Sequence, residues 1–373
     1  MSKLEDAPAA YTFDDFVLVP QYSEVGSRRD PDITSSVKGF TYSIPIVASP
    51  MNTVTEAEML VTMAEIGAVG VLHRYMDVDD QVKIVQEVCT RLSDAGIPMQ
   101  QPDGTPAFYV AVGANGDVED RVRALSQVGV MGFCVDVANG HNEQSVQAVR
   151  AIRRLSPSAH IMAGNVCTYG GAHRLAEAGA NSIRVGIGPG SNCTTRQVTA
   201  HGVPQLSAIE DCARIKEEQI NPNCCNEMPE ILQAYPDVAI IADGGIKRSG
   251  DIIKALAIGA DAVMLGSLLA GTKETPGEVI EEDGRQYKYY HGMASNEARS
   301  KWKGQRIGVP EEGVSRKVPY YGKEAKEVVL KLAAATQVGL SFSGALTVEE
   351  LRERARWRRV SGAGYTEGTP HGK

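Results

Sequence analysis

The stretch Ser182-Ile-Arg-Val185-Gly-Ile-Gly-Pro-Gly-Ser-Asn-Cys-Thr-Thr-Arg196 contains the pattern that decides how the chain folds. Its first four residues include two β-branched side chains and predict a strand that ends at Gly186. Three glycines within five residues then predict a corner in which backbone N–H and C=O groups can face a ligand directly. A strand followed by a polar, glycine-rich corner recurs through the rest of the chain.

Short apolar runs of this kind alternate with amphipathic stretches, such as Glu119–Val128 and Glu143–Leu155. Continuous apolar strands between helices predict a parallel sheet that is buried on both faces. Eight such units close a barrel, whereas an open doubly wound sheet usually has about five to seven strands. The predicted fold class is therefore α/β, a single (β/α)8 TIM barrel. The predicted strands are Pro45–Ala48, Ala68–Leu72, Tyr109–Val112, Gly132–Asp136, Ile161–Ala163, Ser182–Val185, Val238–Ala242 and Ala262–Leu265.

Composition limits the classes of function. The 373 residues are 43% apolar, which is enough for one large core, and the net charge of −8 disfavours nucleic acid as a partner. No run of about 18 apolar residues is present, and the first residues lack a signal-peptide pattern, so no membrane partner is expected. Seven cysteines without zinc-binding spacing predict a reduced, cytoplasmic protein.

The domain organisation predicted is one catalytic barrel over residues 1–373. The segment from Leu72 to Phe108 has room for one helix and a turn, so no second domain is inserted there. Residues 292–320 are polar, aromatic and rich in Lys and Arg, which predicts a mobile flap over the barrel mouth, although a solvated surface would have the same composition. The Gly/Thr/His-rich tail, residues 364–373, is expected to be poorly ordered.

Polar residues gather directly after the predicted strands. In a barrel the carboxyl ends of all strands share one rim, where active sites are built. Any one cluster could be a turn, but their coincidence on one rim favours a site. The clusters are Ser49-Pro-Met-Asn52, His73-Arg74, Asp136-Val-Ala-Asn-Gly-His141, Gly164-Asn165, Gly186–Cys193, Asp243-Gly-Gly245 and Gly266-Ser267.

Four of these clusters suggest particular chemistry. Cys193 is a candidate nucleophile, because oriented amides and Arg196 would favour its thiolate; the alternative is a phosphate-binding loop beside an inert thiol. The glycine-rich corners after strands seven and eight predict a phosphate site. Asp243 would repel a phosphate and is expected to accept from sugar hydroxyls, while Asp136 either contacts a ligand or caps the next helix. The Gly-x-Gly-x-Gly spacing at 186–190 does not match the dinucleotide fingerprint.

Together these motifs resemble the inosine monophosphate dehydrogenase / GMP reductase family. The residues that carry the resemblance are Gly186-Ile-Gly-Pro-Gly-Ser-x-Cys-Thr-Thr-Arg, Ser49-Pro-Met, Ala163-Gly-Asn165, Asp243-Gly-Gly, Met264-Leu-Gly-Ser and Gly292-Met, and the likeness runs from about Tyr11 to about Gly362. The resemblance implies a homotetramer that acts on a purine nucleotide (GMP or IMP), with Cys193 attacking C2 of the base. Thr195 and Glu312 match a catalytic Thr–Glu pair.

The resemblance also implies the ligand contacts. Phosphate would meet Ser191, Gly245, Gly266, Ser267 and Tyr290, and the ribose would meet Asp243. The base would lie near Met51, Met293 and Glu312, with Ser49, Asn165 and Gly292 completing the substrate site. Asp136 would face a nicotinamide, together with Ala138, Asn139 and Gly186. A monovalent cation, potassium, would bind backbone carbonyls of Gly188, Gly190 and Cys193.

Two reactions share such a site. The dehydrogenase oxidises IMP with NAD and uses a flap bearing an Arg-Tyr pair to hydrolyse the intermediate, whereas the reductase converts GMP to IMP and ammonia with NADPH. The segment between Met293 and Glu312 is short and has no Arg-Tyr pair, which favours an NADPH-dependent GMP reductase. Glu311-Glu-Gly-Val314 looks dehydrogenase-like, and Asn52 replaces the usual Asp.

The alternatives are therefore an NAD-dependent IMP dehydrogenase without the inserted cystathionine-synthase-type regulatory domain, and a non-catalytic nucleotide-binding barrel. The presence of Cys193, Thr195 and Glu312 together argues against the non-catalytic barrel, because a binding protein needs the glycines but no thiol.

Overall fold

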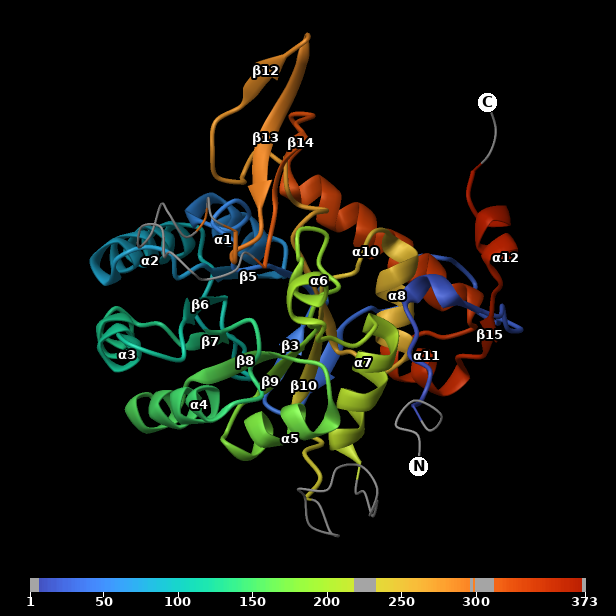
Figure 1. The fold of residues 1–373 in the computed structure, drawn as a ribbon, viewed down its shortest axis with the longest axis horizontal. Coiled ribbons are helices and arrows are strands. Elements are labelled where there is room, and N and C mark those ends of the chain that lie inside the picture. The colour runs from blue at the N-terminus through green and yellow to red at the C-terminus, as the bar shows by residue number, and fades with distance from the viewer. Residues whose placement is uncertain (1–6, 218–232, 296–297, 299–311, 371–373) are drawn as a thin grey trace.

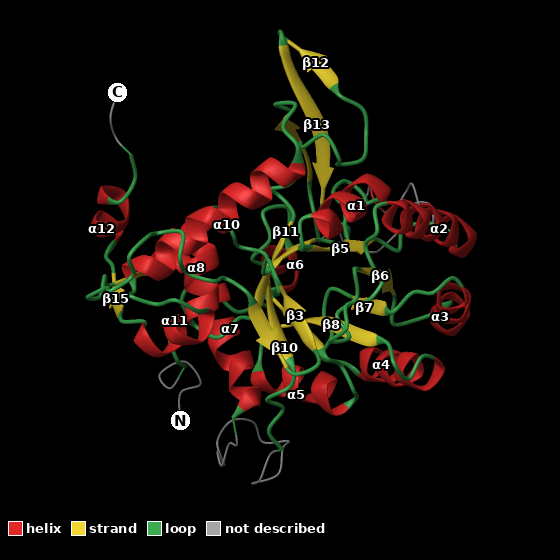
Figure 2. Cartoon of the chain, turned by 180° about the vertical axis from the view of Figure 1, so that it is seen from behind, coloured by secondary structure: helices red, strands yellow, loops and turns green. Residues whose placement is uncertain are grey.

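A closed barrel of eight parallel strands forms the centre of the molecule (Figures 1 and 2). The computed structural model describes residues 7–217, 233–295, 298 and 312–370. The last barrel strand pairs with the first, with Val263 opposite Ile46, which closes the ring. The predicted TIM barrel is thus confirmed. Its strands are β4 (Ile46–Ala48), β5 (Val69–Leu72), β6 (Phe108–Val112), β7 (Gly132–Asp136), β8 (His160–Val166), β9 (Ser182–Val185), β10 (Ala239–Asp243) and β11 (Ala262–Leu265).

Side chains alternate between the inside and the outside of the barrel. On β6, Phe108, Val110 and Val112 pack outward with the helices, whereas Tyr109 and Ala111 belong to a separate cluster inside the ring. Both faces of each strand are therefore buried. This double burial is why the strands read as continuous apolar runs in the sequence.

The outer layer consists of helices that pack against the strands and against one another (Figure 2). The sequence predicts a helix over Glu324–Ala335; the corresponding helix, α10, continues seven residues further and packs on α8. The helices are α1 (Ala57–Glu65), α2 (Val78–Asp94), α3 (Val118–Gln127), α4 (Glu143–Leu155), α5 (Tyr169–Glu177), α6 (Thr195–Thr199), α7 (Gln205–Ala213), α8 (Ser249–Ala257), α10 (Ala325–Phe342), α11 (Val348–Arg354) and α12 (Gly362–Glu367).

The amino-terminal end of the barrel is closed by the hairpin of β2 (Ser35–Val37) and β3 (Phe40–Tyr42). Phe40 and Tyr42 are buried in the same cluster as the inward-facing strand residues. The barrel therefore opens only toward the carboxyl ends of its strands, as far as the described residues show.

A three-stranded antiparallel sheet projects beyond the barrel rim, next to α10 (Figure 1). It contains β12 (Ile280–Glu282), β13 (Arg285–His291) and β14 (Ser315–Pro319). The sequence analysis did not predict β12 and β13, because neither strand is an apolar run: β12 ends in two glutamates, and β13 mixes Tyr with charged and polar residues. The predicted flap, 292–320, contains β14, but its residues 296–297 and 299–311 lie outside the described part of the chain.

The two ends of the described chain meet on one side of the barrel, where β1 (Phe16–Leu18) pairs with β15 (Trp357–Arg359). Helix α12 covers the start of the segment expected to be poorly ordered, and the side chain of Ser361 accepts from Gly364 N at its first turn. Within the described residues, no helix combines the length and the hydropathy needed to cross a bilayer.

Candidate active site

A layer of charged side chains lies inside the barrel at the carboxyl ends of β7, β9 and β10. Because side chains alternate along a strand, Asp136, Arg184 and Asp243 lie above the apolar inner cluster and line the barrel mouth. Arg184 Nη1 donates to Asp136 Oδ1 at 2.7 Å, and Arg184 Nη2 donates to Asp243 Oδ2 at 2.8 Å. One guanidinium thus fixes two carboxylates of the mouth.

Arg184 is the buried member of this trio: its side chain is 5% exposed, against 14% for Asp136 and 17% for Asp243. Burial alone would lower the pKa of Arg184, but the carboxylates of Asp243 and Asp136 more than offset it and hold that pKa well above its usual value. Burial also raises the pKa of the Cys134 thiol to about 12. The positive charge therefore stays on Arg184, and Cys134 stays a thiol.

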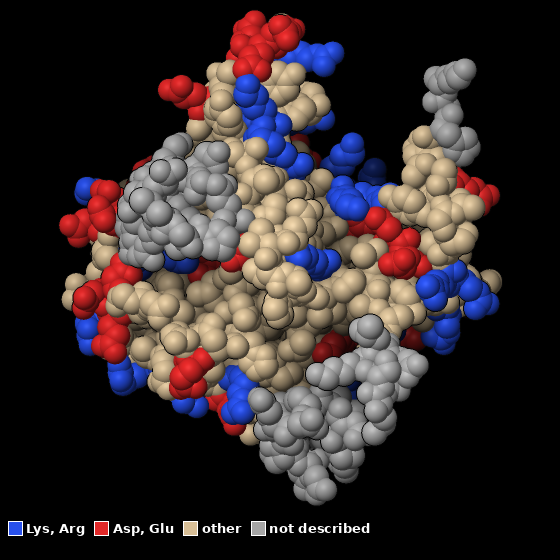
Figure 3. Space-filling model, viewed as in Figure 1, with Lys and Arg blue, Asp and Glu red and all other residues tan. Residues whose placement is uncertain are grey.

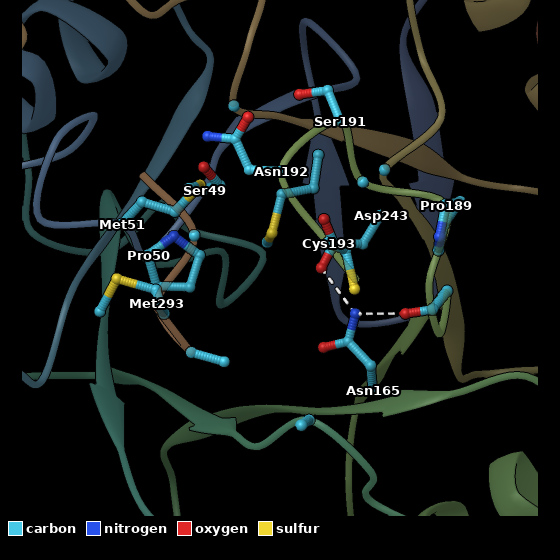
Figure 4. A pocket seen from close by; sticks show the side chains of 18 of the residues that line it. Ser49, Pro50, Met51, Asn165, Pro189, Ser191, Asn192, Cys193, Asp243 and Met293 are labelled. Carbon is cyan, nitrogen blue, oxygen red and sulfur yellow. Dashed lines mark hydrogen bonds between the residues drawn. The ribbon is translucent and has the colours of Figure 1, made fainter. Parts of the chain in front are cut away.

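Asn165 adds a neutral donor to the same cluster. The pairing of β8 with β9 shifts register between Gly164 and Val166, and this irregularity directs Asn165 toward the mouth. Its Nδ2 donates to the carbonyl of Gly186 at 2.9 Å and to Asp243 Oδ2 at 2.8 Å (Figure 4). Arg184 and Asn165 both bind Oδ2, so Oδ1 of Asp243 is the atom to which no described residue donates.

The loop after β9 carries the cysteine. Gly186 has φ +147°, and a Cβ there would lie 2.1 Å from the carbonyl oxygen of Asp243, so the position requires glycine. Cys193 N donates to the carbonyl of Gly190 at 3.0 Å, and Cys193 forms an isolated antiparallel bridge with Gly313. The bridge brings the segment before β14 against the cysteine loop.

Cys193, Thr195 and Glu312 form a hydrogen-bonded chain. The Sγ atom of Cys193 donates to Thr195 Oγ1 at 3.1 Å, and Thr195 Oγ1 donates to Glu312 Oε2 at 2.9 Å. The backbone strengthens the arrangement, because Thr194 N donates to the carbonyl of Glu312 at 3.1 Å. A thiol, a hydroxyl and a carboxylate thus provide a path along which a proton can move.

Small and hydroxyl-bearing residues also line the mouth. We call this group the cradle, and it consists of Ser49, Ser191, Gly266 and Tyr290. A Cβ on Gly266 would lie 2.7 Å from the hydroxyl of Tyr290 and 3.2 Å from Ser49 Oγ. Burial raises the pKa of Tyr290 to about 12, while Ser191 and Arg316 act in the opposite direction. Ser49 Oγ is buried, and the described residues offer it no hydrogen-bond partner. A ligand group that accepts or donates hydrogen bonds would satisfy this hydroxyl.

These groups surround one cavity of about 340 Å³ at the barrel mouth. It brings together every residue that the sequence analysis assigned to a ligand or to catalysis except Asn139. Asn139 instead accepts from His141 N at 3.1 Å, in the loop that precedes α4. The lining residues from that assignment are Ser49, Met51, Asp136, Ala138, Asn165, Gly186, Gly188, Gly190, Ser191, Cys193, Thr195, Asp243, Gly245, Gly266, Ser267, Tyr290, Gly292, Met293 and Glu312.

Two arginines of this mouth were missed by sequence reasoning. Arg184 interrupts the otherwise apolar run of β9, and a charge on the inner face of a fully buried strand is the signal that could have found it. Arg74 was quoted only as part of a polar corner; its Nε donates to the carbonyl of Asp136 at 3.1 Å. Asn52 stands where the resembling family has Asp, and its Oδ1 accepts from His291 Nε2 at 2.9 Å.

Comparisons with known proteins agree with this geometry. A family model described as "IMP dehydrogenase / GMP reductase domain" matches residues 10–371. Among curated proteins, the chain is 34% identical to the inosine-5'-monophosphate dehydrogenase of Cryptosporidium parvum, covering 96% of this chain and 94% of that one. It is 33% identical to the enzyme of the same name from Aquifex aeolicus, covering 96% and 95%.

A solved structure is similar over the whole chain. It is a GMP reductase variant from Trypanosoma brucei in complex with guanosine 5'-monophosphate, with a TM-score of 0.87, 28% identity and complete coverage of both chains. The sequence relatives and this structure thus bear the names of two different reactions.

Proposed function

Because the chain belongs to the IMP dehydrogenase / GMP reductase family of oxidoreductases, we propose that it is a GMP reductase that converts GMP to IMP and ammonia. The observation that carries the proposal is the hydrogen-bonded chain from Cys193 through Thr195 to Glu312. Expelling ammonia requires a proton on the departing nitrogen. These three hydrogen-bonded side chains lead to the sulfur nucleophile whose attack on C2 forces the amine to leave.

In the first step the Cys193 thiol gives its proton through the Thr195 hydroxyl to Glu312, and the thiolate adds to C2 of the base. The addition places the electron pair of the broken C=N bond on the purine ring nitrogen. The C2–NH2 bond then breaks, and the amine leaves as ammonia after it takes a proton that Glu312 passes through the hydroxyl of Thr195. A thioimidate that joins Cys193 to C2 remains. Oδ1 of Asp243 would accept from the ribose hydroxyls and hold the base over the sulfur.

In the second step C2 receives hydride and the C2–S bond breaks, which releases IMP and returns Cys193 to its thiolate. A bound nicotinamide cofactor, proposed as NADPH, supplies this hydride. The residues proposed to contact its ring are Asp136, Ala138 and Gly186, which line the cavity, and Arg184 fixes the side chain of Asp136. We also propose that Asn139 contacts the cofactor, at a part other than the nicotinamide ring.

A monovalent cation, potassium, is proposed at the cysteine loop. Among the described residues no cluster of three His, Cys, Asp or Glu side chains could hold a metal ion, so a cation would depend on backbone carbonyls. Neutral carbonyl oxygens of Gly188, Gly190 and Cys193 are a suitable donor set for a hard monovalent ion. The family also suggests a homotetramer and a cytoplasmic location, which we include in the proposal.

The dehydrogenase reaction is the second candidate, and the specific observation in its favour is the name of the curated relatives at about a third identity. That reaction needs an activated water to cleave the thioimidate, and the resembling dehydrogenases use an Arg-Tyr pair in their flap. Between Met293 and Glu312 the sequence has no such pair, because Arg306 is followed by Ile307. This absence in the sequence supports the reductase.

Absorbance at 340 nm with purified protein distinguishes the candidates. With GMP and NADPH the proposal predicts loss of absorbance and formation of IMP and ammonia. A gain of absorbance with IMP and NAD, without any loss in the GMP reaction, would identify the dehydrogenase instead. Silence in both reactions while GMP still binds would favour the non-catalytic barrel.

A further inference from the structure

We infer that Arg316 binds the 5'-phosphate of the nucleotide and makes the site selective for a phosphorylated substrate over a nucleoside. This inference rests on the proposed function, because the purine nucleotide is the substrate of that proposal. Arg316 lies outside the residues that the sequence analysis assigned to the phosphate. It comes from β14, which follows the segment that delivers Glu312.

The register of the projecting sheet directs Arg316 to the cavity side. Arg316 lies directly opposite Tyr290 in the antiparallel pair of β13 and β14, and opposite residues of such a pair share one face. Tyr290 is 4% exposed and lines the cavity. The guanidinium carbon of Arg316 lies 5.5 Å from the centre of the Tyr290 ring, which holds the cation over the cradle.

Arg316 already contacts a residue of the cradle. Its Nη2 donates to Ser191 Oγ at 2.9 Å. Ser191 itself lines the cavity, so this hydrogen bond places the guanidinium next to the cavity wall. The guanidinium has five N–H donors, and the described residues take up one of them. The remaining donors suit the oxygens of a phosphate.

The charge balance of the cavity leaves this role to Arg316. The described cations that line the cavity are Arg74 and Arg184, and both are engaged with Asp136, while Arg184 also binds Asp243. Asp243 adds negative charge near the cradle, in a chain whose net charge is −8. A phosphate monoester carries between one and two negative charges at neutral pH, so a cation that enters from outside the barrel would improve its binding.

The strand also contains a matched control. Lys317 is the next residue of β14, lies opposite the exposed Tyr289 and pairs with Glu282 near the acidic tip of the projection. It therefore faces away from the cradle. In Figure 3 basic side chains run along the projection beneath its acidic tip, but the register assigns only one of these two neighbours to the cavity.

Calorimetric titration of the full-length protein with GMP and with guanosine tests the inference without turnover. We expect Arg316→Gln to weaken GMP binding by about 10- to 100-fold, the range for a hydrogen bond to a charged group, while guanosine binding changes less than about twofold. Arg316→Lys should recover part of the loss, because it keeps the charge but not the fork. Lys317→Gln should leave both affinities within about twofold. The ratio of the GMP affinity of the wild type to that of Arg316→Gln should decrease as the salt concentration rises.

Three results would overturn the inference: GMP affinity unchanged in Arg316→Gln, an equal loss for GMP and guanosine, or a wild type that binds both equally well. An Arg316→Gln variant in which the KM for the cofactor rises while GMP affinity is retained would also overturn it. Failure of the proposed reductase activity has a different signature, since it appears in the 340 nm assay of the wild type and leaves the binding measurement intact.

Discussion

The two ends of the barrel bury polar groups in opposite ways. At the carboxyl end, Arg184 joins Asp136 and Asp243 beneath an open cavity. At the amino end, Tyr109 and His160 share a 2.9 Å hydrogen bond beneath the β2–β3 hairpin. Both sets come from inward-facing strand positions, so one alternating pattern produces a charged, open mouth and a neutral, closed floor.

The floor is neutral because burial outweighs the effect of the nearby charges. His160 is 5% exposed, its ring packs at 4.3 Å from that of Phe40, and burial lowers its pKa to about 3. Burial likewise raises the pKa of Tyr42 above its usual value. These groups stay uncharged at neutral pH. Polar residues at the floor therefore stabilise the fold, whereas those at the mouth are available to a ligand.

Removal of the nucleophile should have the largest effect at the mouth. Cys193→Ala should lower turnover of GMP with NADPH by about 10⁴-fold or more, because the covalent step is lost. The 340 nm assay measures this, with GMP affinity as the companion measurement. Cys134→Ala is the control lower in the barrel, and it should retain turnover. Activity of Cys193→Ala within tenfold of the wild type would exclude covalent catalysis by this residue.

Loss of the proton path should have the next largest effect. Glu312→Gln keeps the shape of the side chain but removes its proton capacity, so kcat should fall by about 10²- to 10⁴-fold with little change in the KM for GMP. Rapid-quench measurement of ammonia should show that its release has become the slow step. A fall in GMP affinity with an unchanged kcat would instead make Glu312 a binding residue.

Replacing Arg184 with an uncharged residue tests how far the charged cluster at the mouth depends on this shared cation. Arg184→Met removes the cation that two partly buried carboxylates share and should lower the free energy of unfolding by about 3 kcal/mol, measured in urea. Arg184→Lys should lose less, because the charge remains. If Arg184→Met unfolds within about 1 kcal/mol of the wild type, the carboxylates do not depend on this arginine.

The buried His160 at the floor should make the free energy of unfolding depend on pH. The unfolded chain protonates His160 below about pH 6.5, whereas the folded chain does so only near pH 3, so the stabilising contribution is complete above pH 6.5 and is lost as pH falls. Within this window each fall of one pH unit should lower the free energy of unfolding by about 1.4 kcal/mol. In His160→Phe the free energy of unfolding, measured by urea denaturation, should fall less steeply between pH 6.5 and 4, by this amount per pH unit.

The matched control is His141→Gln, at an exposed position of the loop after β7, where the decline should persist. Turnover at pH 7 should be the same in His160→Phe and in the wild type. An unchanged decline in His160→Phe would show that the floor does not hold a neutral histidine.

The sequence predicted the barrel well, because strands buried on both faces are unbroken apolar runs. Predicted and observed bounds agree to within one residue at every strand end except the last residue of β8. That strand is longer because its last residues continue into the irregular segment that presents Asn165. The polar corners were correctly expected on one rim, since the carboxyl ends of the strands coincide there.

What the sequence could not predict depends on contacts between distant segments. Thr195 and Glu312 are 117 residues apart, and only the family resemblance paired them. The projecting sheet has no apolar run, so its pairing of β13 with β14 left no local pattern. Arg184 was hidden inside a strand, where the partners that make its burial possible lie on two other strands.

The most direct test of the account is covalent labelling with a halogenated purine nucleotide, followed by peptide mass spectrometry. Attack of the Cys193 thiolate on the ring carbon that bears the halogen would expel halide and leave the nucleotide on sulfur. The account predicts one adduct, on the peptide that contains Cys193, and protection by GMP. An adduct on another cysteine, or labelling that GMP does not reduce, would contradict a sulfur–purine bond at the mouth of this barrel.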